Sequence, residues 1–201
     1  MSGRRRPRPD PGSIVRGLFL LARFDRSGIE EFGNSVAAFS ASLAPLVAFP
    51  IVGAGLIASQ GDYVTAAIVF LSRLSAVLMQ PVVIEIAARL TRSQPRWLRT
   101  STALNWSVWL LLPLVLIAAL LGNILMAVHA AEHLATYLSI GLALLYLAAI
   151  QWFILRVGLR IKGWQALLIL IATNIAVFFV DALPYILQPG MIAQLVSHRG
   201  A

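Results

Sequence analysis

The chain has 201 residues, of which 59% are hydrophobic and only 12% are charged. An average soluble domain is roughly 45–50% apolar and about 25% charged, so this composition excludes a soluble single domain. The formal net charge is +8, from fifteen arginines and one lysine against eight acidic residues, and there is no cysteine. The lack of cysteine excludes a disulfide framework, a thiolate metal site and a cysteine nucleophile.

The N-terminal region predicts a basic tail followed by an amphipathic helix. Residues 1–12 combine arginine, proline and glycine, a composition that cannot bury enough apolar surface to fold. We expect a disordered tail whose arginines contact anionic lipid headgroups, and these arginines are Arg4, Arg5, Arg6 and Arg8. In residues 13–34 apolar side chains recur on one helical face, while Arg16 and Arg23 lie on the other. This pattern predicts an interfacial helix with both arginines toward the lipid surface.

Five apolar segments follow, each close to the about 20 residues that a helix needs to cross a bilayer core. The expected spans are Ser35–Ala58, Tyr63–Ala88, Asn105–Val128, Leu134–Leu155 and Trp164–Ala182. Together they form a predicted transmembrane domain over residues 35–190, and residues 191–201 form an external tail. Because the connecting segments are short, neighbouring helices should pack antiparallel. The predicted fold is an all-α polytopic membrane protein, with five transmembrane helices preceded by an interfacial amphipathic helix.

The distribution of positive charge predicts which way the spans point. Fourteen of the sixteen Lys and Arg residues lie in the N-terminal region or in the segments after the second and fourth spans. Short segments rich in Lys and Arg stay in the cytoplasm. Trp residues gather at the same span ends and three of the four Tyr residues at the opposite ends, as interfacial aromatic residues do. We expect a protein of the bacterial inner membrane, with a cytoplasmic N-terminus and a periplasmic C-terminus.

Arg73 is the most informative charged residue inside a span. It lies about ten residues, and so roughly 15 Å, from the external end of the second span, near the bilayer midplane. A charge at that depth is costly and should face the bundle interior, a water-filled cavity or a partner. The candidate partners are Asn174 and Asp181 in the fifth span. Glu85 is too far along the same helix and is better placed to pair with Arg89.

Two interpretations of these polar residues stay open. In the first, Arg73 fixes helix packing through a hydrogen bond or an ion pair. In the second, it attracts an anion along a polar path that it forms with Asn174, Gln80 or Asp181. The proline after Gln80 removes a backbone hydrogen bond, and prolines in the first, second and third spans predict bends in those helices.

The segment His129-Ala-Ala-Glu132-His133 has the spacing of inverted zinc metallopeptidases. On a helix this spacing lets both imidazoles bind one zinc ion. Here the segment fills a short external turn, and the chain has no counterpart of that family's soluble fold. We interpret it as a polar turn and keep a metal site as the alternative, whose third ligand would be Asp62, Asp181 or His198. Because no P-loop, dinucleotide fingerprint or nucleophile elbow occurs, we predict no enzyme activity and no cofactor.

The layout resembles that of the Yip1-type membrane proteins, with a cytoplasmic N-terminal region, five closely spaced helices and a short external C-terminus. The segment ARFDRSGIEEFGNSVAAFSASLAP is also similar to small bacterial inner-membrane proteins. The Asp-Leu-Tyr-Gly-Pro motif of the eukaryotic Yip1 branch is absent, so no functional residue is transferred. The resemblance implies a non-enzymatic scaffold or accessory subunit.

We expect such a protein to contact anionic lipid headgroups at its cytoplasmic face. We also expect a membrane-protein partner or a second copy of the chain. No nucleic-acid partner is expected, because the positive charges lie between the hydrophobic spans. The alternative function is a small transporter or channel subunit in which Arg73 attracts an anion.

Overall fold

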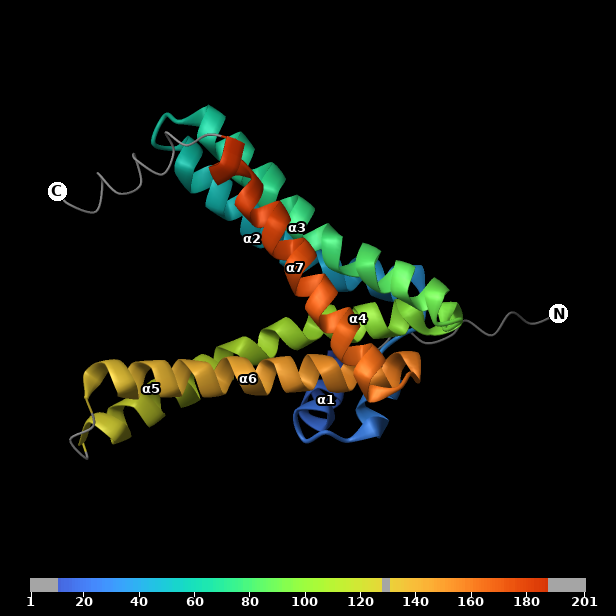
Figure 1. The fold of residues 1–201 in the computed structure, drawn as a ribbon. Coiled ribbons are helices and arrows are strands. Elements are labelled where there is room, and N and C mark those ends of the chain that lie inside the picture. Colours follow the sequence, from blue (N-terminus) through green and yellow to red (C-terminus); the bar gives the residue numbers. More distant parts are fainter. Residues whose placement is uncertain (1–10, 128–130, 188–201) are drawn as a thin grey trace.

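The computed structural model describes residues 11–127 and 131–187, and all regular structure in these ranges is helical (Figure 1). The α-helices are α1 (Pro11–Ala22), α2 (Val36–Ala58), α3 (Tyr63–Leu90), α4 (Trp97–Ser107), α5 (Leu111–Ala127), α6 (Glu132–Leu159) and α7 (Gly163–Leu187). The short 3₁₀-helices are η1 (Arg26–Glu31), η2 (Gln94–Arg96) and η3 (Val108–Leu110). Pro11 and Gly12, predicted as part of the tail, begin α1 instead. The remainder of the predicted N-terminal tail and the tail over residues 191–201 lie outside the described residues.

Five helical segments are long and apolar enough to cross a membrane. They are Val36–Ala58, Tyr63–Leu90, Gln94–Ala127, His133–Leu159 and Gly163–Leu183. Most of their large apolar side chains are exposed at the surface of the protein, as they are where lipid is the solvent. The chain is an all-α polytopic membrane protein, as its sequence predicts.

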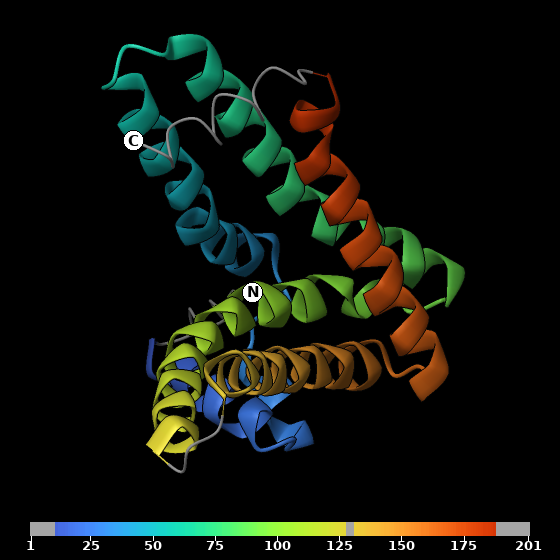
Figure 2. The same ribbon diagram turned by 60° about the vertical axis from the view of Figure 1, so that its left-hand side comes forward.

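The spans form two arms that diverge from a common end (Figures 1 and 2). In the first arm α3 packs against both α2 and α7, and in the second arm α5 packs along α6. α4 lies where the arms meet and contacts both α2 and α6. We call this common end the junction end; it holds α1, η1 and the connections at residues 91–96 and 160–162 (Figure 1). The connection at residues 59–62 and the ends of α5 and α7 lie at the opposite ends, which we call the arm tips.

The single interfacial helix predicted over residues 13–34 is two helical pieces in the structure. Phe24 has a φ angle of 57°, in the left-handed region, and reverses the chain between α1 and η1. The carboxylate of Asp25 then caps η1, accepting hydrogen bonds from the backbone N–H of Ser27 at 2.9 Å and from its hydroxyl at 2.8 Å. The hydrophobic periodicity continues across this turn, which is why the sequence predicts one helix.

The hairpin of α1 and η1 packs against α6 with the apolar face that the sequence singles out. Three of its side chains are buried in the core: Leu21, Ile29 and Phe32. The Phe24 ring makes edge-on contacts with the rings of Tyr146 and Phe153 on α6, at centroid distances of 5.9 and 5.4 Å. Val15 and Phe19 of α1 are exposed. The hairpin therefore has a second apolar side that is free to contact lipid.

The third span begins earlier than the sequence predicts. Residues 89–102, predicted as a connection, include η2 and the first half of α4. Thr100, Thr102 and Asn105 of α4 are buried although they are polar. The two threonine hydroxyls donate to carbonyls four residues earlier, at 2.9 and 2.7 Å, and Asn105 donates to the hydroxyl of Ser42 on α2 at 2.9 Å. Because these groups are hydrogen-bonded, a polar sequence occupies the core of the junction.

One of the three expected proline bends coincides with a break in the helix. η3 interrupts the third span just before Pro113, which has no N–H to bond the carbonyl of Trp109. α2 and α3 remain continuous helices across Pro45, Pro50 and Pro81. The third span therefore changes direction between α4 and α5 (Figure 2).

Candidate functional site

Positive charge gathers at the junction end. All the described Lys and Arg residues except Arg73 belong to α1, η1 or the helix ends and connections that meet there: Arg16, Arg23, Arg26, Arg89, Arg92, Arg96, Arg99, Arg156, Arg160 and Lys162 (Figure 1). Some of these charges are engaged within the chain. Arg16 pairs with Glu31 at 3.5 Å, and Arg23 lies over the ring of Phe19 at 5.5 Å.

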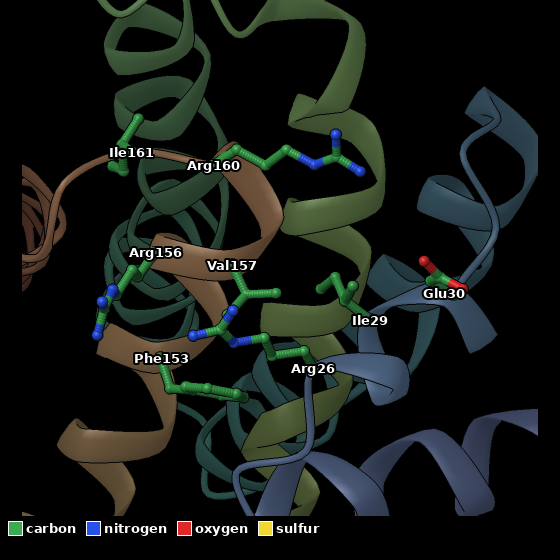
Figure 3. A pocket seen from close by; sticks show the side chains of 8 residues that line it. All are labelled: Arg26, Ile29, Glu30, Phe153, Arg156, Val157, Arg160 and Ile161. Carbon is green, nitrogen blue, oxygen red and sulfur yellow. The ribbon is translucent and has the colours of Figure 1, made fainter.

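A pocket of about 380 Å³ lies between η1 and the last turns of α6 (Figure 3). We call it the basic pocket, and its lining residues are Arg26, Ile29, Glu30, Phe153, Arg156, Val157, Arg160 and Ile161. Three of these residues are arginines and one is acidic. The pocket therefore combines an apolar wall with a net positive charge.

The fold brings the three arginines together from distant parts of the chain. Arg26 begins η1, which the Phe24 turn places beside α6, and it extends toward α6 in Figure 3. Arg156 and Arg160 lie one turn apart at the end of α6, and Arg156 lies over the ring of Trp152 at 5.4 Å. Within the described residues, none of the three forms an ion pair with a carboxylate. Guanidinium groups of this kind recognise phosphate and carboxylate oxygens.

Arg160 occupies a backbone position that usually favours glycine. Its φ and ψ angles are 54° and 47°, in the left-handed region, and its N–H donates to the carbonyl of Arg156 to close α6. Arg92 follows α3 at the junction end and also has a left-handed φ angle, of 55°. A side chain larger than glycine costs stability in this conformation, and such strain is often found at functional sites. Both arginines also add positive charge where the helix dipole is negative.

Arg73, the predicted intramembrane charge, is paired in the structure. Its Nη1 atom donates to Oδ2 of Asp181 on α7 at 2.8 Å. One residue earlier on α3, the Ser72 hydroxyl donates to the carbonyl of Val180 at 3.2 Å. Gln80 and Asn174 lie seven residues inward from the two charged partners, on the same helix faces. The four side chains form a polar seam between α3 and α7.

The inner end of this seam opens into a small polar pocket. Its volume is about 110 Å³, which is enough for several water molecules. Gln80, Gln151, Thr173 and Asn174 give it polar groups from three helices, and the amide nitrogen of Asn174 donates to the carbonyl of Leu170 at 2.8 Å. Glu85 does not line this pocket, and its carboxylate accepts a hydrogen bond from Arg89.

The remaining predicted site residues are not brought together by the described structure. His129 lies outside the described residues, Glu132 begins α6, and His133 is exposed in the first turn of that helix. The described ranges contain no group of three or more His, Cys, Asp or Glu residues placed to hold a metal ion. Asp62 caps α3 instead, and hydrogen bonds from Thr65 lower the pKa of its carboxyl. Arg4, Arg5, Arg6 and Arg8 also lie outside the described residues.

The basic pocket itself is not predicted by the sequence. In the sequence, Arg26, Arg156 and Arg160 contribute only to the charge pattern that orients the spans. That pattern does not predict that they line one pocket. The one local signal is the spacing of Arg156 and Arg160, four residues apart at the end of a span. A comparison with protein families, with curated proteins and with solved structures finds no match for this chain.

Proposed function

We propose that this protein is a non-enzymatic membrane scaffold or accessory subunit that binds anionic lipid headgroups at its junction end. The basic pocket carries this proposal. Its three arginines have no carboxylate partner in the described chain, and they line the pocket together with apolar residues at the end of the spans. A lipid phosphate offers oxygen acceptors to the guanidinium groups, and the adjoining glycerol and acyl segments can contact the apolar wall.

In this proposal the junction end lies in the cytoplasm of a bacterium, the N-terminus is cytoplasmic and the C-terminus is periplasmic. The gathering of Lys and Arg at this end supports the orientation through the positive-inside rule. Anionic lipids of the cytoplasmic leaflet attract each nearby Lys or Arg by about 1 kcal/mol. The exposed Val15 and Phe19 of α1 support contact of the hairpin with the same leaflet.

In the scaffold role, another membrane protein or a second copy of the chain packs against the two arms. Their outward faces carry large apolar side chains, and a membrane-protein partner or a second copy of the chain can contact these faces as lipid does. The resemblance of the helix layout to Yip1-type membrane proteins points to the same class of role. Nucleic acid is not a proposed partner.

Lipid retention during native mass spectrometry tests the proposal. The variant R26Q/R156Q/R160Q removes the three charges of the basic pocket, and we expect about tenfold weaker retention of phosphatidylglycerol. The control R92Q/R96Q/K162Q removes three exposed charges at the same end but outside the pocket, and should retain clearly more of the lipid than the pocket variant does. Equal losses in both variants would show that only the overall charge matters, and would contradict a specific site.

A second candidate function, a small transporter or channel subunit for an anion, is favoured by the polar pocket between α3, α6 and α7. Its four polar side chains lie inside the spans, where such groups are costly. The Arg73 charge is compensated by Asp181, which supports a packing role for the arginine. Chloride flux into proteoliposomes tests this function: flux that N174L abolishes would favour it, and the absence of flux would leave the scaffold proposal.

A further inference from the structure

A second and larger pocket lies on another side of the α1–η1 hairpin. Its volume is about 750 Å³, within the range of sites that hold small organic molecules. α1, η1, the segment of residues 32–35, the start of α2 and one side of α4 form its walls. We call it the amphipathic pocket, because both charged and apolar residues line it. It is separate from the basic pocket, although Glu30 lines both.

Charges of both signs surround the polar end. Glu30 and Glu31 come from η1, and Arg99 comes from the first turn of α4. The backbone N–H of Arg99 donates to the side-chain oxygen of Asn34 at 3.2 Å, and the Asn34 amide donates to the carbonyl of Pro95 at 2.9 Å. These bonds fix the start of α4 against the pocket. The Nε atom of Arg99 is shielded from solvent and has no hydrogen-bond partner among the described residues.

The other end of the pocket is apolar and extends toward the middle of the membrane. Trp106 lies seven residues after Arg99, which places it about 10 Å further along the third span. Ala37 and Ala41 lie one turn apart on α2, and their small side chains leave room beside the indole of Trp106. A molecule with a charged headgroup and an apolar chain therefore fits this pocket.

We propose that the amphipathic pocket binds a zwitterionic phospholipid that carries a primary ammonium group, phosphatidylethanolamine. Arg99 contacts the phosphate, Glu30 and Glu31 contact the ammonium group, and an acyl chain lies along Ala41 and Trp106. Because Arg16 pairs with Glu31 at 3.5 Å, this part of the pocket has two carboxylates and two guanidinium groups, a balance that matches a headgroup with both charges better than a purely anionic one. The basic pocket has three arginines and one carboxylate, and therefore a net positive charge.

Native mass spectrometry with equal amounts of phosphatidylethanolamine, phosphatidylcholine and phosphatidylglycerol tests the assignment. R99Q removes the phosphate contact, and A41F fills the apolar end without changing charge. We expect each variant to retain about tenfold less phosphatidylethanolamine than the unmodified protein. The control R160Q alters only the basic pocket and should retain phosphatidylethanolamine normally. E31Q should remove the preference for phosphatidylethanolamine over phosphatidylcholine, whose quaternary ammonium cannot donate a hydrogen bond.

The other outcomes contradict the proposal. Unchanged retention in both R99Q and A41F would show that the lipid does not bind in this pocket. Loss in A41F alone would show that an acyl chain binds without the headgroup contacts. An equal loss of all three lipids in R99Q would show a general effect of charge. Circular dichroism and elution as a single species establish that each variant is folded before its lipids are counted.

Discussion

Arg73 of α3 and Asp181 of α7 form an ion pair at 2.8 Å, although 108 residues separate them in the chain. The two helices run antiparallel, so moving seven residues inward on both leads from this pair to Gln80 and Asn174. Those two side chains line the same small pocket. One antiparallel register therefore accounts for the whole polar seam between α3 and α7.

The two partners of this ion pair should respond differently to mutation. A guanidinium group stays charged in proteins, and Arg73 lies deep in its span, whereas Asp181 lies only six residues before the end of α7 at the arm tip. We therefore expect D181N to destabilise the protein by about 2.5–3.5 kcal/mol, the cost of an unpaired arginine in a span, and R73Q to cost less. Thermal unfolding in a mild detergent measures both.

The double variant R73Q/D181N removes both charges and should recover much of the stability that D181N loses. The matched control is E85Q, which breaks the partly exposed pair with Arg89 near the junction end and should cost only about 0.3–0.5 kcal/mol. A double variant as unstable as D181N would show that the ion pair does not account for the effect.

Replacing Arg160 should raise the stability of the fold and weaken lipid binding. Replacing it with glycine removes the left-handed strain, so R160G should stabilise the fold by about 1 kcal/mol and raise the unfolding temperature by about 2–4 °C. It should also weaken phosphatidylglycerol retention. R92G removes the same strain outside the basic pocket, so it should be stabilised to a similar extent and bind normally. Normal lipid retention by R160G would exclude Arg160 from the site.

Gly158 allows α6 to approach α4 closely. A Cβ atom there would lie 2.9 Å from Cγ2 of Thr100, and closer still to its hydroxyl oxygen. We expect G158A to destabilise the protein by about 1–3 kcal/mol, and the double variant G158A/T100A to recover part of that loss. Gly141 is the matched control on the same helix, because a Cβ there meets nothing within 4 Å. G141A should be neutral or stabilising, and equal losses at both positions would argue against close packing at Gly158.

The α1–η1 hairpin should loosen in acid. Hydrogen bonds from the backbone and side chain of Ser27 lower the pKa of Asp25 below its ordinary value of 3.8. The carboxylate therefore stabilises the hairpin at neutral pH, and this contribution is lost as the pH falls from 3.8 through the lowered pKa. Hydrogen exchange of the hairpin amides, corrected for the intrinsic effect of pH, should show this opening. D25N should not show it, and D62N, at the other end of the molecule, should leave it unchanged.

Hydropathy predicts the number of spans but misses the start of the third. Arg99, Thr100 and Thr102 make the first half of α4 polar, so the sequence places the span from Asn105 onward. In the structure the hydroxyls of Thr100 and Thr102 donate to carbonyls, and Asn105 donates to Ser42. Because these polar groups are hydrogen-bonded, the segment is buried. A hydropathy scale adds the values of single residues, so it does not account for a side chain that hydrogen-bonds to a backbone carbonyl of its own helix.

The basic pocket depends on contacts that no local pattern contains. Arg26 reaches the end of α6 only because Phe24 takes a left-handed conformation and packs against Tyr146 and Phe153. Phenylalanine seldom adopts that conformation, so neither composition nor periodicity predicts the turn. Arg73 is the opposite case: its depth in an apolar span makes it conspicuous, and Asp181 is among the few partners that the sequence offers.

Site-specific labelling tests the membrane arrangement most directly, because the chain has no cysteine of its own. Single cysteines replace exposed residues at the junction end, Gln94 and Lys162, and at the two arm tips, Gln60 and Ala131. A membrane-impermeant maleimide is then added outside intact bacterial cells that express each variant. We predict labelling of Q60C and A131C, and labelling of Q94C and K162C only after the membrane is opened. Labelling of a junction-end position from outside, or protection of either arm tip, would contradict this arrangement.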